Sequence, residues 1–212
     1  MSARRASRIL KHVLIYAGLV VFLSPFLIVI QNSFKKTQYF VENPIALPDT
    51  FSFANYVDAF HKMNFMQGFV NTLLITVLAV FVIILFSSMT GYLFVRFDWK
   101  ANKVLFFIML AAMTVPFQVI MIPLVMVYGN LGLLDSKAML IFMYMGFGVP
   151  LGVFTFHGFI KGISYELEES SFLDGCSRFR TFFQIVFPLL KPVVVTLIVL
   201  DVLWVWNDYL LP

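Results

Sequence analysis

The sequence predicts an all-α membrane protein, a polytopic bundle of helices. Hydrophobic residues make up 61% of the 212-residue chain and charged residues only 12%, whereas a soluble domain carries about 25% charged residues. Five stretches are long and apolar enough to cross a bilayer, which takes roughly 20 residues of α-helix. The single cysteine excludes an internal disulfide, and the three histidines lie far apart in the sequence, so we expect no metal site and no bound cofactor.

The five expected spans leave no room for a soluble domain. They cover about residues 12–30, 69–94, 104–128, 138–160 and 193–211. A short segment over residues 1–11 precedes them, and the two long connections are an outer loop over residues 31–68 and a polar loop over residues 161–191. In the outer loop, aromatic and apolar residues indicate a short amphipathic helix on the membrane surface: Phe51, Phe53, Tyr56, Val57 and Phe60.

Basic residues predict the orientation, because they are enriched in cytoplasmic loops. If the N-terminus lies inside, the inside segments hold Arg4, Arg5, Arg8, Lys11, Arg96, Lys100, Lys103, Lys161, Arg178, Arg180 and Lys191. The outside segments then hold Lys35, Lys36, Lys62 and Lys137. The bias of eleven to four predicts that the N-terminus and the polar loop are cytoplasmic.

The polar loop contains the most informative segment, residues 165–192, with four of the eleven acids of the chain. Ser164 can cap a first short helix, and Glu166 then falls in its first turn, where a carboxylate interacts favourably with the helix dipole. Asp174 and Gly175 are expected to end that helix, because glycine readily adopts the left-handed conformation. A second helical segment is expected to begin near Ser177, so the segment is a helical hairpin.

The spacing within this hairpin resembles the EAA signature of ABC-importer permeases. That signature has Glu-Ala-Ala, three residues, Gly, nine residues, Ile, one residue and Leu-Pro; this chain has Ser-Ser for Ala-Ala and Phe for Leu. In that family the segment is the coupling helix, which docks in a cleft of the ATP-hydrolysing subunit. The resemblance therefore implies an ATPase-coupling role for Glu169, Ser170, Ser171, Asp174, Gly175, Ile185 and Pro188.

Four further stretches resemble the same family, so the resemblance covers about residues 12–212. They are FVNTLLIT (69–76), GYLFVRFDWKANKVLFF (91–107), TVPFQVIMIPLVMVYGNLGLLDS (114–136) and WVWNDYLLP (204–212). The likeness is greatest to MalG-like permease subunits of binding-protein-dependent carbohydrate importers, which have the MetI-like fold of type I ABC importers. It implies a subunit of the bacterial cytoplasmic membrane that moves a sugar or oligosaccharide by alternating access.

The resemblance also implies partners: a homologous second permease subunit, two ABC ATPase subunits and an external solute-binding protein. ATP and Mg would bind to the ATPase subunits, because this chain has no Walker A pattern, and we expect no enzymatic activity. The same fold serves importers of amino acids, polyamines and sugar phosphates. Two other classes stay open: a membrane-embedded enzyme using Asp201 and Asp208, and a channel or receptor whose hairpin binds a different partner.

Polar residues at membrane depth are the candidates for a solute pathway. A carboxylate in mid-bilayer costs roughly 2.5–3.5 kcal/mol, so Asp201 is expected to face the protein interior, a cavity or a partner. Trp204 and Trp206, near the outer end of the same span, suit sugar stacking, and they suit an ordinary interfacial aromatic belt as well. The candidate pathway residues are Asp201, Asn207, Asp208, Gln118 and Asn71.

Prolines and glycines predict how the spans bend and pack. Pro116 and Pro123 are expected to kink the third span. Three glycines of the fourth span would let a neighbouring helix approach closely: Gly146, Gly148 and Gly152. The chain stops at Pro212 within an apolar run, whereas the resembled subunits have six spans, so we expect the reading frame to continue into a sixth helix.

Overall fold

The computed structural model describes residues 2–211, with side chains for residues 7–211. Met1, Pro212 and the side chains of Arg4 and Arg5, which enter the orientation prediction, lie outside the described residues. The described part of the chain contains helices and connecting segments but no strand, which confirms the predicted all-α class. Residue contacts divide the chain into two units, Met1–Phe69 and Val70–Pro212, and each is described by itself.

In the first unit, α1 (Ser2–Ser33) holds the first expected span. Its Ser7–Ser33 stretch is long and apolar enough to cross a membrane. Pro25 lies within α1 without ending it. Proline is tolerated in spanning helices where neighbouring groups or local adjustments satisfy the backbone groups that it frees.

The segment after α1, which the sequence predicts as the outer loop, forms a cap containing α2 (Thr37–Glu42) and α3 (Ala54–Lys62). The side-chain amide of Asn55 donates to the carbonyl oxygens of Ser33 at 2.9 Å and Lys35 at 2.7 Å, so it ties α3 back to the end of α1. Four aromatic rings pack beside these bonds: Phe34, Phe51, Phe53 and Tyr56. The predicted short helix of the outer loop is present as α3.

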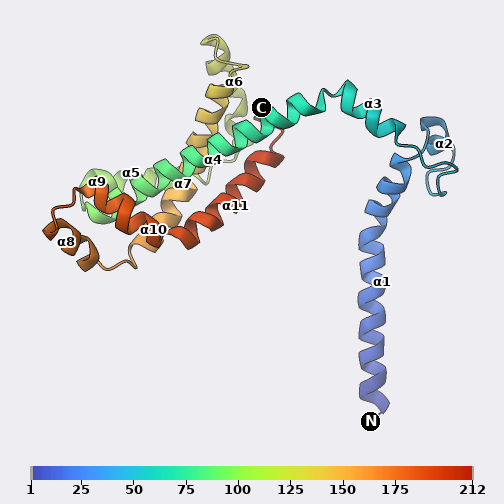
Figure 1. The fold of residues 1–212 in the computed structure, drawn as a ribbon, viewed down its shortest axis with the longest axis horizontal. Coiled ribbons are helices and arrows are strands. Elements are labelled where there is room, and N and C mark those ends of the chain that lie inside the picture. The colour runs from blue at the N-terminus through green and yellow to red at the C-terminus, as the bar shows by residue number, and fades with distance from the viewer. Residues whose placement is uncertain (1, 212) are drawn as a thin grey trace. The chain divides into compact units, whose positions relative to one another are not determined.

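The second unit is centred on α4 (Phe65–Arg96), which begins in the first unit, α7 (Lys137–Ile160) and α11 (Lys191–Asn207) (Figure 1). A larger apolar cluster joins these helices and the segment before α11: Val80, Ile84, Tyr92, Phe156, Ile160, Phe182, Val186, Leu190, Val193 and Leu197. A smaller cluster joins the same three helices nearer the end of α11: Ala79, Ile83, Tyr144 and Val205. These two clusters fix α4, α7 and α11 against one another.

Small residues let α4 and α7 approach closely. A Cβ atom added at Gly152 would lie 2.6 Å from the Cβ atom of Ser87, and one added at Gly148 would lie 2.6 Å from the Cδ1 atom of Ile83. Nothing lies within 4 Å of a Cβ atom added at Gly146. Two of the three predicted glycines therefore face α4, as expected where close packing drives helix association in lipid.

The third expected span differs from the sequence prediction of one kinked helix. It consists of α5 (Lys100–Ala112) and α6 (Phe117–Asn130), whose axes are bent by 103°. Pro116 is the residue that precedes α6, and its backbone is extended. Proline lacks the N–H that would continue α5, and it disfavours helical geometry in the residue before it. Pro123 lies inside α6 without ending it.

The fifth expected span, residues 193–211, corresponds to α11 (Lys191–Asn207), which is one helix. The continuous segment of α9 (Arg178–Thr181), η1 (Phe182–Val186) and α10 (Phe187–Leu189) precedes α11 at a bend of 77°. α11 ends at Asn207, four residues before the expected end of the span at residue 211. Three helices among the described residues are long and apolar enough to cross a membrane, and the number is five if each bent pair counts as one span.

Candidate functional site

α8 (Glu166–Leu173) is the first short helix of the polar loop. The Ser164 hydroxyl accepts a hydrogen bond from the Glu166 N–H at 3.3 Å and so satisfies one of the amide groups that a helix start leaves without an intrahelical partner. Three carboxylates lie in the first turn, where the helix dipole favours negative charge: Glu166, Glu168 and Glu169. α8 therefore begins where the sequence predicts.

The end of α8 is a Schellman motif. The N–H of Gly175 donates to the carbonyl oxygen of Phe172 at 3.0 Å, and the N–H of Cys176 donates to that of Ser171 at 3.0 Å. Gly175 has φ +81°, a conformation that glycine adopts without the steric cost of a Cβ atom. The Ser177 hydroxyl then caps α9. The predicted helical hairpin is confirmed, with its turn at Gly175.

A buried carboxylate anchors one side of α8. Glu168 is 0% exposed; its Oε2 atom accepts from the Tyr92 hydroxyl at 2.7 Å, and its Oε1 atom accepts from Arg96 Nε at 2.7 Å. The Arg96 guanidinium also donates to the carbonyl oxygen of Ile163 at 3.0 Å. Tyr92 and Arg96 belong to the end of α4, so this ion pair joins α4 both to α8 and to the segment before it.

A second buried contact joins the two arms of the hairpin. The hydroxyls of Ser171 and Thr181 lie 2.7 Å apart, and both residues are buried. Thr181 ends α9 and leads into η1, a π-helix, which is a rare element that occurs frequently at functional sites. The ring of Phe182, the first residue of η1, lies 5.1 Å from that of Tyr92. The hairpin, η1 and the end of α4 therefore pack together.

The other side of α8 is open. Leu173, its last residue, is 89% exposed. Four of the seven residues predicted for ATPase coupling are also exposed on α8 or at its end: Glu169, Ser170, Asp174 and Gly175. Ser171 instead faces inward, and Ile185 and Pro188 lie farther along the chain, in η1 and α10. The open face combines carboxylates, a small residue and one large apolar side chain, which suits a protein partner.

Asp201 is buried near the middle of α11. The residue is 3% exposed, and its Oδ2 atom has no hydrogen-bond partner within residues 2–211. Leu197, one turn before it, and Val205, one turn after it, belong to the two apolar clusters. The carboxyl group therefore faces the protein interior, one of the surroundings that the sequence predicts for it.

Two of the other predicted pathway residues form hydrogen bonds between helices. Asn71 Oδ1 accepts from Lys137 Nζ at 2.7 Å, which joins α4 to the start of α7. Asp208 Oδ2 accepts from the Tyr144 hydroxyl at 3.1 Å, which joins the end of α11 to α7. The ring of Trp204 lies edge-on to that of Tyr144, with centroids 5.6 Å apart. These polar and aromatic contacts connect the three central helices.

The five predicted pathway residues do not form one cluster. The side-chain amide of Asn207 donates to the Leu203 carbonyl of its own helix at 2.7 Å. Gln118 is exposed near the start of α6, and no interaction with the other four is present in the described part of the chain. Asp201 lies about 10 Å along the helix axis from Asp208, at a rise of about 1.5 Å per residue.

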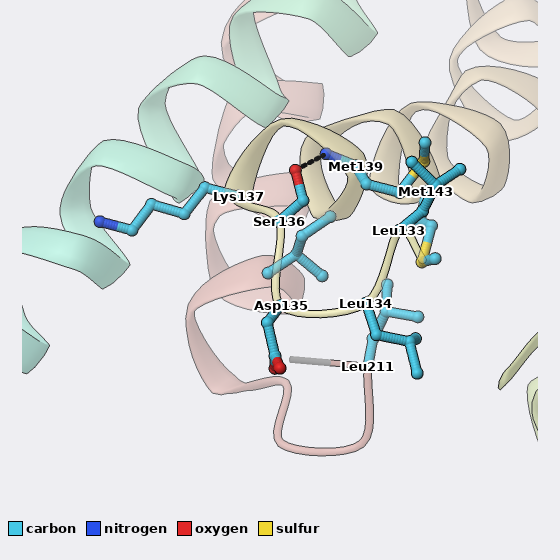
Figure 2. A pocket seen from close by; sticks show the side chains of 9 residues that line it. Leu133, Leu134, Asp135, Ser136, Lys137, Met139, Met143 and Leu211 are labelled. Carbon is cyan, nitrogen blue, oxygen red and sulfur yellow. Dashed lines mark hydrogen bonds between the residues drawn. The ribbon is translucent and has the colours of Figure 1, made fainter. Parts of the chain in front are cut away.

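An open pocket lies between the α6–α7 connection, the start of α7 and Leu211 (Figure 2). Its volume is about 210 Å³, below the range of about 300–1,000 Å³ that is typical of small-molecule sites. Leucine and methionine side chains supply most of its lining. Lys137 extends away from Leu211 in Figure 2, and its ammonium group is bonded to Asn71. The pocket offers few polar groups to a hydrophilic solute.

Residues 83–212 match a family model described as "Binding-protein-dependent transport system inner membrane component". The matched segment includes the last 14 of the 32 residues of α4 (83–96) and everything after it, so it contains the hairpin and both partners of the Arg96–Glu168 ion pair. The chain belongs to this family. It is a transport permease and not an enzyme, and its apolar helices make it a multi-pass membrane protein. The predicted class, a permease subunit of an ABC importer, is confirmed.

Relatives of this permease match almost its whole length. It is 43% identical over 211 residues to the "Probable starch degradation products transport system permease protein AmyC" of Thermoanaerobacterium thermosulfurigenes, which covers 98% of this chain and 77% of the relative. It is 30% identical over 211 residues to the "Diacetylchitobiose uptake system permease protein NgcG" of Streptomyces coelicolor, and this match covers 100% of this chain and 70% of the relative. A solved bacterial ABC transporter involved in the import of the acidic polysaccharide alginate has a TM-score of 0.76 at 23% identity, over 99% of this chain and 74% of that chain, which confirms the fold.

The sequence reasoning missed the inward-facing residues of this permease: Tyr92, Arg96, Glu168 and Thr181. One signal could have found part of the set, because Glu168 and Ser171 are three residues apart and therefore share one face of a helix. Arg96 follows a long uncharged run and is the first charge at the end of a spanning helix. Neither signal identifies the partner, because the rotation of α8 about its axis is set by tertiary contacts.

Proposed function

We propose that this permease imports oligosaccharides and that α8 couples it to an ATP-hydrolysing partner. Support for the sugar class comes from relatives named for starch degradation products, for diacetylchitobiose and, in Bacillus subtilis, for melibiose, raffinose and stachyose. One observation carries the coupling role: the outer face of α8 is exposed, whereas its inner face is fixed to α4 through Glu168. A helix held in this way can bind a partner on one side and move a spanning helix on the other.

In the proposed assembly, this chain pairs with a homologous second permease subunit, two ATPase subunits and an external solute-binding protein. ATP and Mg bind to the ATPase subunits, since this chain carries no Walker A pattern. The N-terminus and α8 lie on the cytoplasmic side of a bacterial cytoplasmic membrane, and the bias of basic residues supports this orientation. Glu169, Ser170, Asp174 and Leu173 form the surface that contacts the ATPase subunit.

The proposed cycle is alternating access. ATP binding closes the ATPase pair and displaces α8, and the contacts of the hairpin with α4 and η1 convert that displacement into a tilt of the spanning helices. Release of the binding protein and ATP hydrolysis then reset the assembly. Residues of the pathway are proposed to include Asp201, with the polar groups of Asn71, Gln118, Asn207 and Asp208, whose amides and carboxyls suit sugar hydroxyls.

A crosslinking experiment tests the coupling surface. Cys176 is the only cysteine of the chain, so Leu173→Cys in a Cys176→Ser background gives one reactive site on the open face of α8. We expect crosslinks to single cysteines in the cleft of the co-expressed ATPase subunit, with a yield that changes when ATP binds. Leu47→Cys is the control: Leu47 is also highly exposed, at 75%, but it lies in the cap after α1, so it should give none. An assembled complex without any crosslink from position 173 would overturn the coupling role.

The solute class is tested with the reconstituted complex in liposomes, together with its binding protein. ATPase activity is measured with maltotriose, melibiose or diacetylchitobiose, and with glutamine, spermidine or inorganic phosphate as non-sugar solutes. We expect stimulation by at least one of the sugars and by none of the other solutes. Stimulation confined to a non-sugar solute would overturn the sugar assignment and leave the importer class in place.

A further inference from the structure

We propose that the Arg96–Glu168 ion pair is the link through which α8 moves the spanning helix α4, which makes Arg96 and Glu168 positioning residues for transport. The inference rests on the proposed coupling role of α8 and adds the route by which motion leaves that helix. The ion pair lies on the face of α8 opposite to the exposed one, at the point where the end of α4 reaches the hairpin.

The covalent connections of α8 are poorly suited to transmit force. Residues 161–165, between α7 and α8, form turns and a bend instead of a helix. At the other end, Gly175 makes the turn into α9 with φ +81°. Small numbers of residues at element ends are the usual places where φ and ψ changes are absorbed in a hinge. A displacement of α8 would therefore be taken up in these turns unless side chains carry it onward.

The side-chain contacts of Glu168 are better suited to that task. Its two carboxylate oxygens accept bonds of 2.7 Å from Tyr92 and from Arg96, and hydrogen bonds to ionised groups are shorter and stronger than neutral ones. The Arg96 side chain is 12% exposed and that of Glu168 0%, so the pair is largely shielded from water. Because Arg96 also holds the Ile163 carbonyl, one guanidinium fixes α8 and the connection before it.

The physical chemistry of the Arg96–Glu168 ion pair favours a role in holding α8 in position against α4. A buried ion pair gives little net stability compared with apolar residues of the same volume, but separating its partners leaves a charge buried without a counter-charge. Hydrogen bonds weaken steeply with misalignment, so α8 cannot shift without α4 and keep both bonds. The Ser171–Thr181 contact, by comparison, ties α8 only to the other arm of its own hairpin.

α4 extends the link across the membrane. It is one continuous helix from Phe65 to Arg96, so a displacement at Arg96 passes along a single element. Near its other end, Asn71 is bonded to Lys137 at the start of α7. The proposed route therefore starts at the ATPase-facing surface of α8, passes through the Arg96–Glu168 ion pair and follows α4 to its other end, beside the start of α7.

The test is the number of solute molecules transported per ATP hydrolysed by the complete complex in liposomes. Glu168→Gln keeps the shape of the side chain and removes its charge. We expect this variant to assemble and hydrolyse ATP while the transport ratio falls by about tenfold, within the range of 5- to 150-fold typical of coupling between sites. Glu42→Gln is the control, since it makes the same change at an exposed position outside the hairpin, and its ratio should be unchanged.

A purely structural role makes a different prediction. Complex yield and ATPase activity of Glu168→Gln would then fall together with an unchanged ratio, and that result would overturn the proposal. If Glu168→Gln does not assemble, Tyr92→Phe is used in its place, because it removes one hydrogen bond to Glu168 and keeps the ion pair. We expect the transport ratio of Tyr92→Phe to fall by less than tenfold. An unchanged ratio in Tyr92→Phe would also overturn the proposal. A wild-type complex without any solute-dependent ATPase activity would instead refute the proposed coupling of this permease to ATP hydrolysis.

Discussion

Replacing Gly152 with alanine tests how closely α4 and α7 are packed. The added Cβ atom would lie 2.6 Å from the Ser87 Cβ atom and 2.5 Å from its Oγ atom, whereas non-bonded carbon atoms normally lie about 3.5–4.0 Å apart. Ser87 is buried, and its hydroxyl donates to the Ile83 carbonyl of its own helix at 2.6 Å. The helices must therefore separate locally by about 1 Å. Overpacking of this kind costs about 1–3 kcal/mol.

The assay is the free energy of unfolding of the permease in mixed micelles, measured by titration with sodium dodecyl sulfate and circular dichroism. Gly146→Ala is the matched control on the same helix, because nothing lies within 4 Å of the added Cβ atom. It should keep or raise the stability, since alanine favours a helix over glycine by about 1 kcal/mol. The stability of Gly148→Ala should lie between those of Gly152→Ala and Gly146→Ala, because its Cβ atom would meet the flexible end of the Ile83 side chain.

A second change separates local packing from a general effect of alanine. Adding Ser87→Gly to Gly152→Ala removes both atoms that the new Cβ atom would meet, so the double variant should recover part of the lost stability. The coupling between the two positions is then the difference between the double variant and the sum of the single ones. The packing argument is wrong if Gly152→Ala is as stable as the wild type, or if Gly146→Ala loses as much stability.

Three further changes probe the hairpin and the buried acid in the same unfolding titration. Ser171→Ala leaves the buried Thr181 hydroxyl without its partner and should lower the stability by about 1–3 kcal/mol. The exposed variant Ser170→Ala is the control and should change the stability by no more than about 0.5 kcal/mol. An equal loss of stability in the two variants would contradict this reasoning. Gly175→Ala should cost about 1–2 kcal/mol at φ +81°, and Gly175→Asn should cost less. Asp201→Leu removes a carboxyl whose Oδ2 atom has no partner among the described residues, so the stability should rise by about 1–3 kcal/mol while solute uptake falls. Lower stability of Asp201→Leu would show that the carboxyl is satisfied in the native state.

The sequence predicts those features that depend on local chemistry. A helix that crosses the membrane must be long and nearly free of charge, so the positions of α1, α4 and α7 follow from the composition of the sequence. The hairpin also follows, because Ser164 and Ser177 can cap helices and Gly175 permits the left-handed turn. Each of these signals acts within a few residues of the chain, and each needs no knowledge of the neighbouring helices.

The features that depend on tertiary packing could not be predicted in the same way. Pro116 predicts a disturbance of the third span, but whether the chain bends slightly or by 103° depends on what α5 and α6 pack against. Glu168 and Glu169 are neighbours of identical chemistry, and only the docking of α8 on α4 decides which one is buried. The separation of the pathway candidates has the same cause, because the sequence places Gln118 and Asp201 at similar membrane depth but does not show whether their helices pack together.

η1 makes the segment between Thr181 and Pro188 tolerant of a one-residue change in chain length. A π-helical turn accommodates one residue more than the α-helical turn that it replaces, and each residue of a regular α-helix advances the side chains by about 100°. Loss of one residue from 182–186 would convert η1 into a regular helical turn and keep Thr181 close to its present rotation, so its hydroxyl would still reach Ser171. The same deletion in a segment that is already α-helical would rotate the preceding side chains by about 100°. η1 is therefore the place in this segment where the chain length can change by one residue without moving the contact between the two arms of the hairpin.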